Sequence, residues 1–375
     1  MGESSSSRGF SVTSSRHGNV QTLLLAALAV IALGAALKTL YFVLMPLAFA
    51  FYLAVLVYPV QRRMTIFFPP SLAWMGTVSA MGLILAVLAA GVGAAWLCAK
   101  QLLVNSPDYA ELFLRYRNRA VAWVESLGIP VSSELTDTEQ VLRNALGIVR
   151  AVAWSGWSLA AMTALVFFFV LLMLLEASRW RLKATEIMPH LQDGVVLDTI
   201  EVMAVRLRQY LWVTTVCGII TGAINGVWLW YMGVDFALLW GLLAFLLNYI
   251  PNVGSIIAGT LPSLLAVVML GPADAIITIA GLALVEQVMG NFVQPRMQGR
   301  RLELSPLMAL FSVVFWGWAW GVAGAFLAVP LTITMVIVFA HVPALRSVAL
   351  LLSRTPHYEV LEQKTDAEAV AAEKP

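Results

Sequence analysis

Apolar residues in this chain are gathered into long blocks that alternate with shorter polar segments. The blocks run from 17 to 38 residues, and several are longer than the roughly 20 residues that a helix needs to cross a bilayer. They are also continuous, whereas a half-buried helix in a soluble protein shows apolar residues at a spacing of three to four. The pattern therefore predicts an all-α polytopic membrane protein with about eight transmembrane helices, namely six full spans and two broken or re-entrant hairpins.

The N-terminal part of the pattern predicts three transmembrane helices within residues 23–99. A polar segment, 1–22, comes first. The block 23–60 is too long for one crossing and is broken only by Lys38, which favours a tight helical hairpin with Lys38 at its turn. The block 71–99 is the third span.

Two polar segments flank the fourth span, 151–175. Segment 100–150 carries six basic and six acidic side chains and contains the helix-start residues Ser106 and Thr136, so it is expected to be an external helical domain. Segment 176–208 has its apolar residues on one helical stripe, which is typical of an amphipathic helix on the membrane surface or against a partner helix.

The C-terminal membrane domain, 209–345, differs because glycine, proline and asparagine interrupt it repeatedly. The blocks 236–270 and 305–341 would each exceed 50 Å as straight helices at about 1.5 Å per residue, against a hydrocarbon core of roughly 30 Å. Each is broken near its middle, so each is predicted to be a hairpin that either crosses fully or re-enters. The block 275–291 between them is a short span.

Composition and charge fix the orientation. The chain is 60% hydrophobic and 12% charged, and its mean hydropathy is +0.84, so it has too few charged side chains for a soluble surface. The net charge of +2 gives no indication of nucleic-acid binding. With the N-terminus inside, sixteen Lys and Arg residues are cytoplasmic and seven external, which satisfies the positive-inside rule. Both termini are therefore predicted to be cytoplasmic, and the polar tail 346–375 disordered.

Glu286 is the ionisable residue whose position is hardest to account for. It lies about twelve residues into the span 275–291, where a charged carboxylate is costly. A carboxyl group at that depth can bind and release a proton or coordinate a cation. Pairing with Arg296 or with a neighbouring subunit, and simple exposure at the membrane interface, are the alternatives that stay open.

Interrupted helices in two parts of a membrane chain indicate a transport site, because broken backbone is tolerated only where it is buried in protein or lines a cavity. We therefore expect the two hairpin breaks and the Glu286 helix to form the substrate or ion pathway. Its candidate residues are Asn248, Pro251, Asn252, Gly254, Glu286, Gln287, Asn291, Pro295, Gly317, Gly321, Gly324 and Pro330.

The sequence does not indicate an enzyme. It contains no His-Glu-x-x-His, no Gly-x-Ser-x-Gly and no glycine-rich phosphate loop followed by lysine. No catalytic, cofactor-binding or metal-binding residue is predicted.

Two motifs resemble the autoinducer-2 exporter (AI-2E) family of bacterial membrane proteins. The first is the aromatic-Ile-Pro-x-x-Gly break within 248–254. The second combines Asn-Phe-Val-Gln-Pro at 291–295, Leu-Ser-Pro-Leu at 304–307, the glycines at 317, 321 and 324, and Leu-Ala-Val-Pro-Leu at 327–331. The order of segments is similar over residues 20–345. One departure is Ser305, where the family usually has histidine, so a proton-relay role for that histidine does not carry over.

The resemblance implies a multi-pass permease in the bacterial inner membrane that forms a homo-oligomer in the lipid bilayer. Family members are associated with export of the autoinducer-2 type of signal in quorum sensing, and some are described as sodium or lithium/proton antiporters. The expected substrate is thus a small molecule or a cation. A non-transporting scaffold or regulator that binds partners through segment 100–150 is the remaining alternative.

Overall fold

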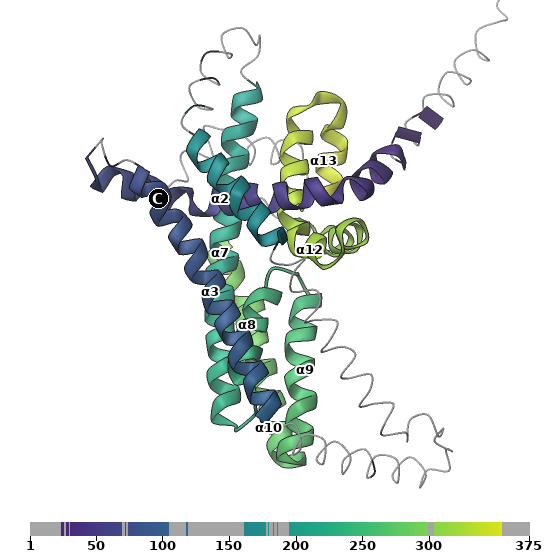
Figure 1. The fold of residues 1–375 in the computed structure, drawn as a ribbon. Helices are drawn as coiled ribbons and strands as arrows, with labels where there is room; N and C mark the ends of the chain where they lie inside the picture. The colour runs from purple at the N-terminus through teal and green to yellow at the C-terminus, as the bar shows by residue number, and fades with distance from the viewer. Residues whose placement is uncertain are drawn as a thin grey trace, which may run out of the picture.

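The computed structural model describes residues 31–69, 74–104, 161–177, 195–298 and 304–354, with a few isolated positions besides. This part of the chain is helical and contains no strand (Figure 1). Five of its helices are long and apolar enough to cross a membrane, judged by length and composition, and shorter apolar helices accompany them. The prediction of an all-α polytopic membrane protein is thereby confirmed.

Several predicted segments lie outside the described residues. These are the N-terminal segment 1–22, nearly all of the external domain 100–150, the first part of the span 151–175, most of 176–194 and the end of the tail beyond 354. Their assignments stay predictions.

The N-terminal helix differs from the predicted hairpin at Lys38. Residues 31–39 and α2 (Tyr41–Phe67) are both helical, and only Leu40 between them leaves helical geometry. The Leu40 N–H still donates to the Ala36 carbonyl at 2.9 Å. A reversal between antiparallel helices needs a loop of about two to five residues. The chain therefore bends at Leu40 rather than reversing, and it contains no glycine or proline there that would break a helix.

Lys38 instead takes part in a contact with the last long helix, α12 (Pro306–His341). Its ammonium group lies 4.8 Å from the centre of the Trp318 ring, a cation–π arrangement. Beside it, Trp320 Nε1 donates to the Leu37 carbonyl oxygen at 3.0 Å. These contacts hold the segment 31–39 against the middle of α12.

A first hydrophobic cluster joins α2 to α3 (Trp74–Val104) and to the helix Ala161–Ala177, which lies within the predicted fourth span. Two alanines on α2, Ala50 and Ala54, are buried in it. Their small side chains let the neighbouring helices approach closely, which is how helices associate in a membrane. The first three membrane helices described are thus one packed unit.

α7 (Val195–Tyr231) is one helix of 37 residues, about 55 Å long at 1.5 Å per residue. It includes the end of the predicted segment 176–208 and continues without a boundary into the predicted membrane domain 209–345. Leu207 and Leu211 are buried against α12 and α2, so this stretch packs on partner helices. The predicted boundary near residue 208 reflects a change in composition, which does not by itself end a helix.

The block 236–270 forms two helices, α8 (Ala237–Leu247) and α9 (Val253–Leu270), joined by the turn 248–252. α10 (Pro272–Val288) follows, then a π-helical turn (Met289–Val293) and α11 (Gln294–Gln298). In Figure 1, α7, α8 and α9 stand roughly upright, and α3 slants across them.

α12 is broken in its middle and folds back on itself. Trp320 and Gly321 leave helical geometry, and Gly321 has φ +65°. Trp316 Nε1 lies 3.3 Å from the Thr332 hydroxyl. Sixteen residues of straight helix would separate those two positions by about 24 Å. The block 305–341 is therefore a helical hairpin, in agreement with the breaks predicted from its glycines.

The last described helix, α13 (Arg346–Leu352), lies where the tail was expected to begin. A 3₁₀ turn, Pro343–Leu345, connects it to α12. Ala349 is fully buried in the same cluster as α12. Its apolar sequence, Val-Ala-Leu-Leu-Leu, explains why this stretch packs on the membrane domain.

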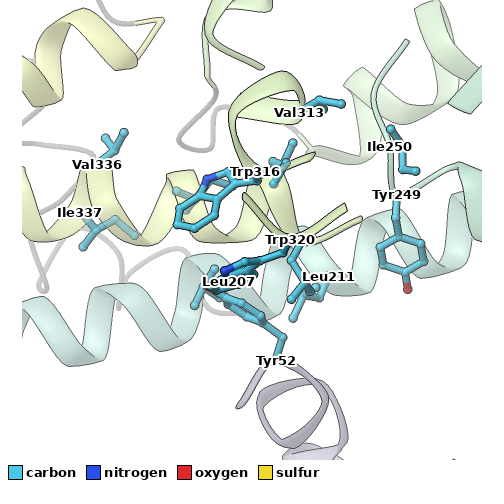
Figure 2. Close-up of a cluster of buried hydrophobic side chains, with 14 of the residues drawn as sticks. Tyr52, Leu207, Leu211, Tyr249, Ile250, Val313, Trp316, Trp320, Val336 and Ile337 are labelled. Atoms are coloured by element: carbon cyan, nitrogen blue, oxygen red, sulfur yellow. The ribbon is translucent and has the colours of Figure 1, made fainter. Parts of the chain in front are cut away.

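The largest hydrophobic cluster joins α2, α7, the turn 248–252 and α12. Figure 2 shows α2 nearly end-on where α7 and α12 run across the view, with Tyr52, Leu207, Trp316 and Ile337 between them. The Tyr52 hydroxyl lies 3.0 Å from that of Thr334 on α12. This cluster holds both broken hairpins against α7.

Replacing Gly324 with alanine is expected to destabilise the protein by about 1–3 kcal/mol, because the new Cβ would overlap the Trp316 carbonyl oxygen. Gly317→Ala in the same hairpin is the control, since its Cβ would meet only the Ala325 methyl at 3.8 Å. Thermal unfolding of the detergent-solubilised variants measures the difference. Equal stability of the two variants would contradict the close approach of the limbs.

Candidate functional site

The turn 248–252 at the tip of the first hairpin is tied to α7. Asn248 Nδ2 donates to the Thr214 carbonyl oxygen at 2.9 Å. The hydroxyl of Tyr249 lies 2.6 Å from that of Thr215. Asn252 has φ +61°, which asparagine tolerates better than most residues. This turn, which contains the predicted site residues Asn248, Pro251 and Asn252, is thus held against α7 by two side-chain contacts.

Each broken hairpin contains a glycine at the start of its second limb that touches the first limb. A Cβ at Gly254 would collide with the Leu247 carbonyl oxygen, and one at Gly324 with that of Trp316. Only glycine allows this approach of backbone to backbone. Both hairpins therefore have a glycine at the same place after the turn, although they come from different parts of the chain.

The breaks of the two hairpins meet. Tyr249 in the first turn stacks on Phe326, five residues past Gly321, with ring centres 4.5 Å apart. Phe326 in turn stacks on Phe49 of α2 at 5.8 Å. Pro330 is buried in the same cluster of helices. The structure thus brings together the site residues predicted in 248–254 and 317–330 and surrounds them with aromatic rings.

Glu286 and Gln287 lie elsewhere, in a groove between α9 and α10. The groove has a volume of about 690 Å³. Its lining includes the hydroxyl-bearing residues Ser255, Thr260 and Ser263 on α9, and Glu286 and Gln287 on α10. Most of the lining is apolar, and its few oxygen atoms can hydrogen-bond hydroxyl groups or coordinate a hard cation.

Glu286 is half-buried and lies one turn before the π-helical turn Met289–Val293. It has no ion pair with Arg296, or with any other side chain in the described part of the chain. Asn291 Nδ2 donates to Gln287 Oε1 at 2.6 Å, which orients the amide next to Glu286. Single π-helical turns occur often at functional sites. Pro295 follows on α11 and is exposed.

The predicted site is therefore two neighbouring regions rather than one. Gly317, Gly321 and Gly324 belong to α12, where Gly324 is buried and Gly321 is exposed, and they do not line the groove. The link between the two regions is α9, whose Gly254 belongs to the first break and whose Ser255 lines the groove.

The hydroxyl-bearing residues of α9 were not predicted. Ser255, Gly259 and Ser263 recur every four residues on an otherwise apolar helix, so a search for a polar stripe in 253–270 would have found them. The stacking of Tyr249 on Phe326 has no such pattern, because the two residues are far apart in sequence.

These features define a multi-pass α-helical membrane protein whose C-terminal half is built from broken helices beside a groove that Glu286 and Gln287 line. The sequence profile of AI-2E family transporters matches residues 24–344, which is most of the chain. The chain therefore belongs to the AI-2E family of transporters.

Curated relatives agree with this assignment. The chain is 31% identical over 316 residues to the "AI-2 transport protein TqsA" of Escherichia coli strain K12, which covers 83% of this chain and 89% of that protein. It is 27% identical over 339 residues to a "Putative transport protein" of Haemophilus influenzae, covering 89% of this chain and 97% of that one. Both similarities extend well beyond the motifs in 248–331.

Tyr249→Phe is expected to lower stability by about 0.5–1.5 kcal/mol, because it removes the hydroxyl contact with Thr215 and keeps the ring stack. Tyr231→Phe is the control, since that side chain is 75% exposed. Thermal unfolding in detergent compares the two variants. If both variants unfold like the wild type, the hydroxyl contact does not hold the tip of the hairpin.

Proposed function

We propose that the protein is a secondary transporter that exports a small hydroxyl-rich molecule of the autoinducer-2 type through the groove between α9 and α10. The observation that carries this proposal is the groove, which Glu286 and Gln287 of α10 line together with hydroxyl-bearing residues of α9. Membership of the AI-2E family and the name of the E. coli relative support the same class of substrate.

The groove suits a small molecule in size, and it offers a few polar groups within a mostly apolar lining. Its volume of about 690 Å³ is within the range of roughly 300–1,000 Å³ found for small-molecule sites. Hydroxyls donate and accept hydrogen bonds, the Gln287 amide does both, and the Glu286 carboxylate accepts. Apolar residues, among them Ile256, Leu264 and Leu282, complete the lining.

The first hairpin is best explained as re-entrant. α8 has 11 residues and is about 16 Å long, roughly half of a 30 Å hydrocarbon core. Broken backbone at that depth has to be covered by protein or line a cavity. The turn 248–252 is covered by α7 and α12, and the next residues of α9 line the groove. This arrangement places the groove beside a broken helix, as in other secondary transporters.

Glu286 is proposed as the coupling group. Its half-buried carboxylate lines the groove beside Gln287 and has no cationic partner among the described residues. In this proposal the carboxylate carries the coupling ion while the neighbouring Gln287 and Ser255 bind the substrate.

A sodium or lithium/proton antiporter is the second candidate, because the same oxygens that bind hydroxyl groups can coordinate a hard cation. Sodium- or lithium-dependent dequenching of a pH dye in everted membrane vesicles would favour it. A scaffold or regulator acting through segment 100–150 is the third. Removing residues 106–148 with flux preserved would argue that this segment is accessory.

We further propose a homo-oligomer in the bacterial inner membrane, with both termini cytoplasmic. The excess of basic residues on the predicted inner side supports the orientation. The candidate span Ala273–Met297 is 17% buried within one subunit, so most of its surface is available to lipid or to a second copy.

Glu286→Gln is expected to abolish proton-coupled flux in reconstituted vesicles, because the amide cannot exchange a proton at this site. Asp274→Asn on the same helix is the control, since Asp274 is exposed in the first turn of α10. It should leave flux unchanged. The measurement is substrate or cation flux at several pH values, and retained flux with the same pH dependence would remove Glu286 from the mechanism.

Substrate identity is tested by comparing the small molecules that accumulate outside wild-type and deletion cells, without choosing a compound beforehand. We expect a hydroxyl-rich furanone-type molecule to be depleted outside the deletion cells. Depletion of an unrelated compound would contradict the proposed substrate, but it would not contradict the proposed location of the site.

A further inference from the structure

Four helices, α7 to α10, surround a common interior. α7 packs against α8 and α10, and α9 packs against the same two helices. α7 and α9 therefore stand across from each other, as in a four-helix bundle. Small residues allow close packing around this interior: Gly222 of α7 lies against the backbone of Gly241 on α8.

Thr221 and Asn225 of α7 lie on the face that looks into this interior. Gly222 lies against α8, whereas Trp228 Nε1 donates to a carbonyl oxygen of α10 at 3.1 Å. At about 100° per residue, Thr221 and Asn225 fall between these two contacts. Both side chains are buried, with exposed fractions of 3% and 2%.

These two side chains have oxygen atoms without a hydrogen-bond partner among the described residues, namely Thr221 Oγ1 and Asn225 Oδ1. They are one helical turn apart. α9 adds a third acceptor, because Pro262 lacks an N–H and so leaves the Ala258 carbonyl without its usual partner in the helix. Ala258 and Pro262 are both buried.

We propose that this interior is a binding site for ordered water, held by Thr221, Asn225 and the Ala258 carbonyl. Buried water typically has two to four polar partners and satisfies groups that the protein leaves unpaired. A metal ion suits the site less well, because these ligands are all neutral and a cation would keep its charge in an apolar bundle.

Radiolytic hydroxyl-radical labelling of the full-length protein in detergent, read by mass spectrometry, tests the proposal, because radicals form from trapped water and label adjacent side chains. Leu229 lies one turn after Asn225 and packs against Ala266 of α9, and Leu207 lies in the main cluster. Both leucines are on α7 and 0% exposed. We expect several-fold more labelling at Leu229, and equal labelling overturns the proposal.

A pair of isosteric substitutions provides a second test. Thr221→Val removes a water ligand, so its thermal-unfolding midpoint should fall by a few degrees below that of the wild type. Thr278→Val is the control, because the Thr278 hydroxyl already donates to the Asp274 carbonyl at 2.8 Å in the same helix and is equally buried. If the site were dry, valine would relieve an unsatisfied hydroxyl. A midpoint for Thr221→Val at or above the wild-type value therefore overturns the proposal.

Neither test measures transport, so this inference stands or falls separately from the proposed function.

Discussion

The contact between the two broken hairpins is the constraint on which the C-terminal half depends. A break in a helix exposes backbone groups that water cannot satisfy inside a membrane. The stack of Tyr249 on Phe326 places the first break against the second hairpin, and the Tyr249 hydroxyl reaches Thr215 of α7. Each hairpin thereby covers the break in the other hairpin. The position of each hairpin therefore depends on the other.

Close backbone approach makes this arrangement possible. Gly254 and Gly324 let the limbs of each hairpin touch, and Gly222 lets α7 touch α8. Lipid is as apolar as leucine, so there is little hydrophobic gain from bringing these helices together, and van der Waals packing has to supply the attraction. Small residue size thus decides where α7 and α8 meet and how closely the limbs of each hairpin approach.

The sequence was most informative where a residue type restricts the backbone. Glycine and proline positions predicted the breaks in 236–270 and 305–341, and the carboxylate at Glu286 marked the helix that borders the groove. It was misleading at Lys38, where a charged residue in an apolar block suggested a turn. Its cation–π contact with Trp318 depends on a helix some 280 residues away, and no local pattern encodes such a partner.

The candidate site consists of two regions, the contact between the two hairpin breaks and the groove between α9 and α10. The position of the turn 248–252 explains this division. Because the turn ends at Asn252, α9 begins at Val253, and Ser255 falls near the level of Glu286 and Gln287 on the antiparallel α10. A shift of the turn would carry Ser255 along the groove. The same turn is held by Tyr249 against α12. A displacement of the second hairpin would therefore change the lining of the groove although α12 itself contributes no residue to it.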